Sequence, residues 1–152
     1  MKGKQPKSLN CNTVYDITEG PDGKLWLATF GGGINIMTHQ NGSVAFLNKD
    51  NGLSRWPKRM KENRVRKLLF TPSGVLIAAT TEGLITQERG KKFILHVKEP
   101  GRRANLSCNA TMDIALMGNN KLFVSTESGG INEVEISPGH TTKLFFRHFN
   151  TL

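Results

Sequence analysis

The sequence predicts an all-β protein built as three four-stranded antiparallel blades of an incomplete β-propeller. Three observations support this class. An internal repeat recurs with steps of 51 and 46 residues, short apolar segments alternate with turn sequences, and no segment has a convincing amphipathic helical pattern. Four short strands in every 40 to 50 residues is the period of a propeller blade. A solenoid of stacked hairpins is the alternative with a similar period.

The repeat has several anchors that keep one register. Each unit contains an alternating segment, then a segment that begins with Leu eight residues later and ends in Thr, then Gly followed by an aliphatic residue. The Thr anchors are Thr29, Thr80 and Thr126, and the Asn residues that repeat with the same two steps are Asn12, Asn63 and Asn109. Independent anchors in a common register rarely arise by chance, so the repeat predicts three equivalent structural units.

The first unit predicts four strands joined by tight turns. The sequences Gly20-Pro-Asp-Gly23 and Gln40-Asn-Gly42 are typical of turns, and a run of three glycines at 31–33 also reverses the chain. The segment 25–29 is apolar enough to be buried on both faces. The strands expected are 13–18, 25–29, 34–37 and 43–47.

The second and third units repeat this pattern. The strands expected are 64–70, 75–80, 83–88 and 92–98 in the second unit, and 110–117, 121–126, 131–136 and 142–149 in the third. We assign 10–54, 55–105 and 106–152 to the three blades, and 1–9 to the end of a preceding blade or a leader. Trp26, Ile77 and Phe123 stand at one repeat position, so we expect all three to be buried between neighbouring blades.

Three blades are fewer than a closed propeller needs. Propellers have about four to eight blades, and an isolated wedge leaves two apolar sheet faces uncovered. Both ends of the sequence fall at expected blade boundaries. We therefore expect the remaining blades of the same chain to be partners of this segment.

The first unit also carries a family resemblance. It reads Asn-x-Val-x-x-Ile over 12–17, Asp-Gly-Lys-Leu-Trp-Leu-Ala-Thr over 22–29, Gly-Gly-Gly-Ile over 31–34, then Phe46 and Asn-Gly-Leu-Ser over 51–54. This pattern resembles the two-component regulator propeller repeat. The second and third units depart from it, because Ile77 and Phe123 replace the Trp and the second unit has a shorter turn.

The resemblance implies a function outside catalysis. Such repeats build the periplasmic sensor domain of hybrid two-component histidine kinases, which control transcription of glycan-use genes. It implies an oligosaccharide ligand, a homodimer in the full-length protein, and a place in the extracytoplasmic part of an inner-membrane protein. It implies no direct contact of this segment with nucleic acid.

The net charge and the lack of catalytic motifs also bear on the class of function. The net charge is +9, from 21 Lys and Arg against 12 Asp and Glu, which favours an anionic partner. No run of apolar residues is long enough to span a membrane. We find no nucleophile elbow, phosphate loop, carboxylate pair or metal-ligand spacing, so we expect no catalytic residue, no metal and no cofactor.

Basic residues in two connections between units are the candidate ligand site. The stretch 55–67 has seven basic residues and one acid, and it precedes a first strand, as does a second basic pair. Connections of this kind open on one face of a propeller, where Arg can bind carboxylates or sulfates through two hydrogen bonds. The residues expected to bind the ligand are Arg55, Trp56, Lys58, Arg59, Arg64, Arg102 and Arg103.

Simpler readings of these residues stay open. A basic run is often a solvated loop, and Trp56 could pack onto a blade instead of a sugar ring. Two other functions also stay open: part of a propeller lyase, which would need a His and an acid on the axial face, and a structural or protein-docking propeller.

Overall fold

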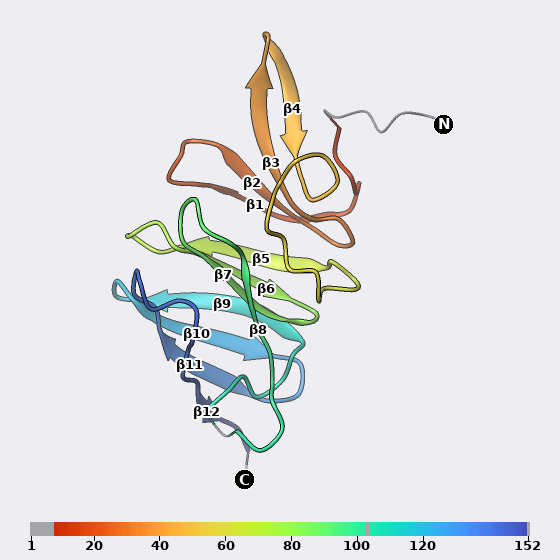
Figure 1. Ribbon diagram of the computed structural model, residues 1–152. Coiled ribbons are helices and arrows are strands. Elements are labelled where there is room, and N and C mark those ends of the chain that lie inside the picture. The colour runs from red at the N-terminus through yellow and green to blue at the C-terminus, as the bar shows by residue number, and fades with distance from the viewer. Residues whose placement is uncertain (1–7, 103, 152) are drawn as a thin grey trace.

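The computed structural model describes residues 8–102 and 104–151, which form β-strands arranged in three four-stranded antiparallel sheets. The first sheet contains β1 (Val14–Glu19), β2 (Leu25–Thr29), β3 (Gly33–Gln40) and β4 (Ser43–Leu47). The second contains β5 (Val65–Phe70), β6 (Leu76–Thr80), β7 (Gly83–Gln87) and β8 (Ile94–His96). The third contains β9 (Thr111–Met117), β10 (Lys121–Thr126), β11 (Ile131–Glu135) and β12 (Arg147–Phe149). Each sheet pairs its strands in chain order, and the sheets stack one upon the next, as Figure 1 shows.

The predicted fold class is confirmed. The fourth strands of the second and third blades are shorter than we expected. We predicted strands over 92–98 and 142–149, but β8 and β12 each have three residues. The backbone before each of them binds a connecting segment instead of a neighbouring strand. The amide of Phe93 donates to the carbonyl of Arg55 (3.3 Å), and the amide of Phe146 donates to the carbonyl of Ala104 (2.7 Å). In the described residues no helix is long and apolar enough to cross a membrane.

The repeated Thr closes the turn between the second and third strands of each blade. Its Oγ1 donates to the carbonyl of the following repeat glycine, at 2.7 Å for Thr29, 2.8 Å for Thr80 and 2.8 Å for Thr126. The same oxygen accepts a bond from an amide inside the turn in all three blades. A glycine is needed at the turn's end, because a Cβ on Gly83 would lie 2.4 Å from the carbonyl oxygen of His96.

Apolar side chains fill the interface between the first and second sheets. Trp26 packs edge-on against Phe70 with ring centroids 5.2 Å apart, and its indole N–H donates to Asp22 in the preceding turn (3.2 Å). The buried residues around this pair come from both sheets and include Ala28, Ile34, Ile36, Leu68, Leu76, Ala78 and Ile85. The turn sequence that we identified at 20–23 therefore also satisfies the polar atom of the buried indole.

The second and third sheets share a similar interface. Its buried residues include Val75, Ile77, Ala79, Leu84, Ile114, Leu122, Val124, Val134, Leu144 and Phe146. Strand β6 serves both interfaces, because successive side chains of a strand point to opposite faces. All five of its residues are buried, which explains why its sequence is a continuous apolar run.

The first strands of neighbouring blades lie next to one another, with β1 against β5 and β5 against β9. Polar contacts also join neighbouring blades near these strands. Asp16 accepts a hydrogen bond from the amide of Leu68 at 2.9 Å, and the hydroxyl of Thr111 both accepts from the amide and donates to the carbonyl of Thr80, at 2.8 and 2.9 Å. These bonds lock the inner edge of each sheet to its neighbour.

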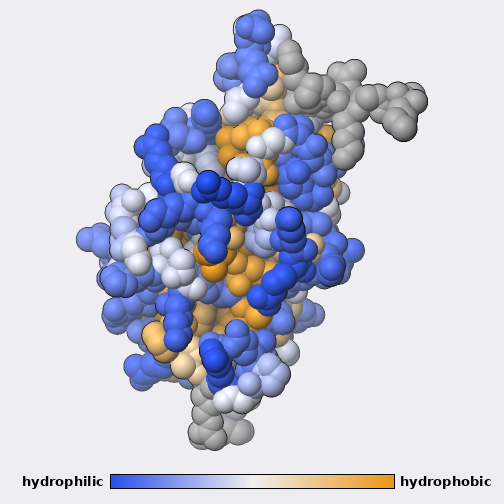
Figure 2. Space-filling model, viewed as in Figure 1, coloured by the Kyte–Doolittle hydropathy of each residue, from blue (hydrophilic) through white to orange (hydrophobic). Residues whose placement is uncertain are grey.

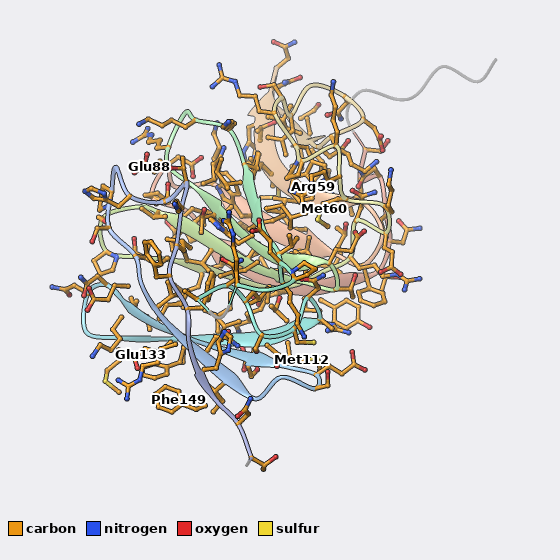
Figure 3. The ribbon with its side chains drawn as sticks, turned by 60° about the horizontal axis from the view of Figure 1, so that its bottom comes forward. Arg59, Met60, Glu88, Met112, Glu133 and Phe149 are labelled. Carbon is orange, nitrogen blue, oxygen red and sulfur yellow. The ribbon has the colours of Figure 1, made fainter. Side chains whose placement is uncertain are left out.

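Phe123 is only half-buried, so our expectation for it was wrong. Trp26 faces the second sheet and Ile77 faces the third. Phe123 lies on the far face of the third sheet, which no further sheet of the described chain covers. That face also carries Glu133 and the exposed Phe149, which lie near each other in Figure 3. The repeat position is thus equivalent in all three blades, while its burial depends on a following sheet.

This difference between equivalent positions can be measured. We expect Trp26→Ala to lower the free energy of unfolding by about 3–5 kcal/mol, because it leaves a cavity between two sheets. Phe123→Ala is the matched control and should cost on the order of 1 kcal/mol, since that ring has no sheet against it. Urea unfolding monitored by circular dichroism compares the two. Equal losses for both variants would contradict the assignment of the two interfaces.

Candidate ligand-binding face

The connection between β4 and β5 carries most of the predicted site residues, and Trp56 fastens it to the blades. The Trp56 ring packs edge-on against Phe93 with centroids 5.2 Å apart. Its indole N–H donates to the side chain of Asn63 at 2.9 Å, and a Cβ added at Gly33 would lie 2.9 Å from the indole ring. Trp56 is half-buried, so in this structure it holds the connection in place.

The side chain of Arg55 also makes its hydrogen bond within the protein. It has a positive φ of 64°, and its guanidinium donates to the carbonyl of Gly90 at 3.2 Å. Gly90 lies in the turn between β7 and β8, at the opposite end of the sheet from Arg64, which precedes β5. Arg55 therefore points away from Arg64.

Arg64 lies at the inner end of the connection beside an acidic partner. Its guanidinium is 3.0 Å from the carboxylate of Glu62 and stacks over the ring of Phe30, with 4.9 Å from Cζ to the centroid. The carboxylate of Glu82 accepts bonds from the amides of Lys61 and Glu62. These two acids reduce the positive field that the sequence suggested here.

Arg59 and Arg102 are the two predicted residues that the structure brings together. Both line one open pocket of about 360 Å³ at the outer edge of the second and third sheets. Figure 2 shows hydrophobic surface between hydrophilic groups in the middle of the face on which β8 lies. Figure 3 shows Arg59 well apart from Glu88 in the turn that precedes β8. The other residues that line the pocket are Ile94, Leu95, His96, Val97, Glu99, Asn105, Thr142, Lys143, Leu144 and Phe146.

The charged groups of this pocket, which we call the rim pocket, are three cations and one carboxylate. Arg102 is 3.3 Å from Glu99 and its side chain is 66% exposed. Arg59 and Lys143 are also exposed. Apolar side chains and the Asn105 amide complete the walls. A pocket with this lining can accept a sugar ring and attract a sulfate or carboxylate group on it.

His96 forms part of the inner wall of the rim pocket. Its Nε2 lies 2.8 Å from the hydroxyl of Thr86, and its ring packs against Phe146 with centroids 6.3 Å apart. Burial lowers the pKa of His96 from 6.5 to about 4. The imidazole is therefore neutral at pH 7 and adds no charge to the pocket.

The predicted site residues thus do not form one cluster, because among those that the structure describes only Arg59 and Arg102 line a common pocket. Lys58 is exposed, and Arg103 lies outside the described residues. Sequence reasoning missed Lys143, Asn105 and His96, because they come from other connections or from a last strand and belong to no motif. A ligand role for any of the predicted residues stays a prediction.

The strand order and the stacked sheets define a segment of a β-propeller. Within it, residues 8–31 match the family model of the two component regulator propeller. This match covers the first blade's first two strands and the start of the turn after them. The first blade therefore carries a two component regulator propeller repeat.

Solved structures share the fold. The extracellular domain of a protein described as the hybrid two component system BT3049 from B. thetaiotaomicron superposes with a TM-score of 0.73 at 23% identity, over 99% of this chain and 20% of that chain. The extracellular domain of a protein described as the one component system BT4673 from the same organism gives a TM-score of 0.62 at 16% identity, over 93% of this chain and 16% of that chain. The chain spans a fifth or less of the length of these two solved chains. No curated protein matches it.

The neutral His96 predicts how stability depends on pH. The unfolded chain has the ordinary His pKa near 6.5 and the folded chain about 4, so between these values the unfolded state binds more protons. The contribution of His96 to the free energy of unfolding is full above pH 7 and falls as pH drops toward 4. At pH 5 the loss is on the order of 2 kcal/mol.

Urea unfolding at pH 8 and pH 5 measures this loss. In His96→Gln the loss attributable to His96 should vanish. His39→Gln changes an exposed His on β3 and should keep the pH dependence of the parent chain. An unchanged pH dependence in His96→Gln would contradict the assignment.

Proposed function

We propose that this chain is part of an extracytoplasmic sensor propeller of a two-component system and that it binds an oligosaccharide signal. The observation that carries the proposal is the two component regulator propeller repeat in the first blade, on a fold shared with extracellular domains of proteins described as two component and one component systems. In the parent protein the segment would join further blades, act as a homodimer, and control a histidine kinase and the transcription of glycan-use genes.

The rim pocket supports an acidic oligosaccharide as the ligand. Arg59, Arg102 and Lys143 surround apolar walls, with Glu99 as the opposing charge. Each exposed ion pair contributes little, so several contacts must act together. His96 beside them is neutral, so ligand binding would not remove water from a charged imidazole. Two of the other predicted residues, Arg55 and Trp56, already have partners inside the protein and would act by holding the connection in place.

The arrangement of the His residues gives little support to the lyase alternative. His39 lies on β3, His96 on β8 and His148 on β12, while His140 lies in the connection between β11 and β12. None of these four positions lies on a first strand, where a His and acid pair would face the axis.

Calorimetry tests the proposed ligand. We expect the chain to bind a sulfated or uronate hexasaccharide more tightly than a neutral one, with binding that weakens from 50 to 300 mM salt, because the charges that attract it are screened. The double variant Arg59→Glu, Arg102→Glu should weaken binding at least about tenfold, a loss of about 1.4 kcal/mol.

Arg89→Glu is the matched control for the single variant Arg59→Glu, because each changes the net charge by two. Arg89 is exposed in the turn after β7 and lies outside the rim pocket, so this change alters net charge without touching the site. An equal loss of binding in Arg89→Glu would show a general charge effect and contradict the pocket. Binding that does not change with salt would contradict an acidic ligand.

A further inference from the structure

A β-bulge occurs at the same place in the first strand of each blade. The pairing between first and second strands shifts between Val14 and Asp16 and between Val65 and Lys67, and a shift also occurs in the third blade where Ser125 and Thr126 pair with Asp113 and Thr111. Three first-strand residues have no paired residue on the second strand of their blade: Tyr15, Arg66 and Met112. A bulge redirects side chains and is frequent beside binding sites.

The three bulge residues have different environments. Arg66 reaches across to the third blade, where its guanidinium donates to the carbonyl of Thr111 at 3.1 Å and lies beside the sulfur of Met112. Tyr15 makes no such bridge to a neighbouring blade among the described contacts. It packs instead on Phe30, with ring centroids 4.6 Å apart and planes inclined by 48°.

Tyr15 and Arg64 both contact the ring of Phe30, and we call these three residues the axial platform. Phe30 follows the end of β2, and its amide donates to the carbonyl of Thr13. Arg64 covers Phe30 from the second blade. Tyr15 is 55% exposed, and the side chain of Arg64 is 44% exposed. The platform thus presents an aromatic ring to solvent on a rigid support.

The platform is specific to the first blade. The repeat positions of Phe30 in the other blades are Thr81 and Glu127, neither of which is aromatic. Sheet packing therefore does not require an aromatic residue here. An exposed aromatic ring that packs against a second ring offers an apolar face with a negative quadrupole to a ligand.

The cation of the platform has an acidic partner. The guanidinium of Arg64 is paired with Glu62, whose other carboxylate oxygen accepts a bond from the hydroxyl of Thr81 at 3.0 Å. This pairing offsets the positive charge of Arg64. It does leave a donor and an acceptor at the edge of the aromatic surface, where they can bind hydroxyl groups.

We propose that the axial platform binds the apolar face of an uncharged pyranose ring, with Tyr15 beneath the ring and Arg64 and Glu62 at its hydroxyl groups. The C–H bonds on one face of a pyranose carry partial positive charge and are attracted to the negative face of an aromatic ring. The proposal rests on the proposed oligosaccharide sensing and adds a neutral subsite, separate from the acidic groups that the rim pocket would bind.

The chain contains a single tyrosine, so 3-fluorotyrosine labelling reports on the platform through one ¹⁹F resonance. We expect a saturable shift of this resonance with at least one of a panel of neutral hexasaccharides of glucose, mannose, xylose and galactose. The shift should keep the same midpoint at 50 and 300 mM salt. By calorimetry, Tyr15→Ala should weaken the same binding about tenfold, whereas Tyr15→Phe should retain it because the ring is kept.

Two variants separate this proposal from the rim pocket. Phe30→Leu removes the supporting ring and should abolish the ¹⁹F shift, while Arg59→Glu should leave it unchanged. Absence of a shift with every neutral sugar, or a shift that persists in Phe30→Leu, would overturn the platform. A shift caused only by acidic sugars and lost in Arg59→Glu would also overturn it while supporting the proposed function.

Discussion

The structure depends on one constraint, which is that its sheets carry apolar side chains on both faces. The clearest case is β6, whose alternate residues pack against the first sheet on one side and the third on the other. Burial of apolar surface contributes about 25 cal/mol per Å², so neither face of such a sheet is stable in water. The sheets therefore stack, and the polar bonds from Asp16 and Thr111 are needed only along their inner edges.

Regular turns within each blade leave the connections between blades free to differ. The Thr and Gly of each second-to-third turn use the same hydrogen bonds three times. The connection from β4 to β5, by contrast, is held by Trp56 and Arg55 through contacts that occur once. Binding groups commonly reside on such loops above a rigid scaffold. The rim pocket follows this division through Arg59 and Arg102, whereas the axial platform combines Arg64 of such a connection with Tyr15 of β1 and with Phe30 in the turn after β2.

Part of the candidate site could be predicted because the repeat relates equivalent connections. Arg59 and Arg102 both lie in segments that lead into a first strand, and the structure places both at the rim pocket. Lys143 could not be found in this way, since it comes from a connection within the third blade. The sequence also did not predict that Glu62 pairs with Arg64 or that Glu82 binds the amide of Lys61. These contacts depend on distances between loops, which sequence spacing does not define.

The sequence by itself determined the blades, their strand order and the position of each closing turn, because these depend on local periodicity and on residues a few positions apart. Only the tertiary structure decided which equivalent positions are buried. Trp26 and Phe123 share one repeat position, yet the second sheet covers the former and no described sheet covers the latter. It also decided which charges meet, as Arg64 does with Glu62 and Phe30. Burial and pairing of this kind depend on contacts between distant segments, which no local pattern records.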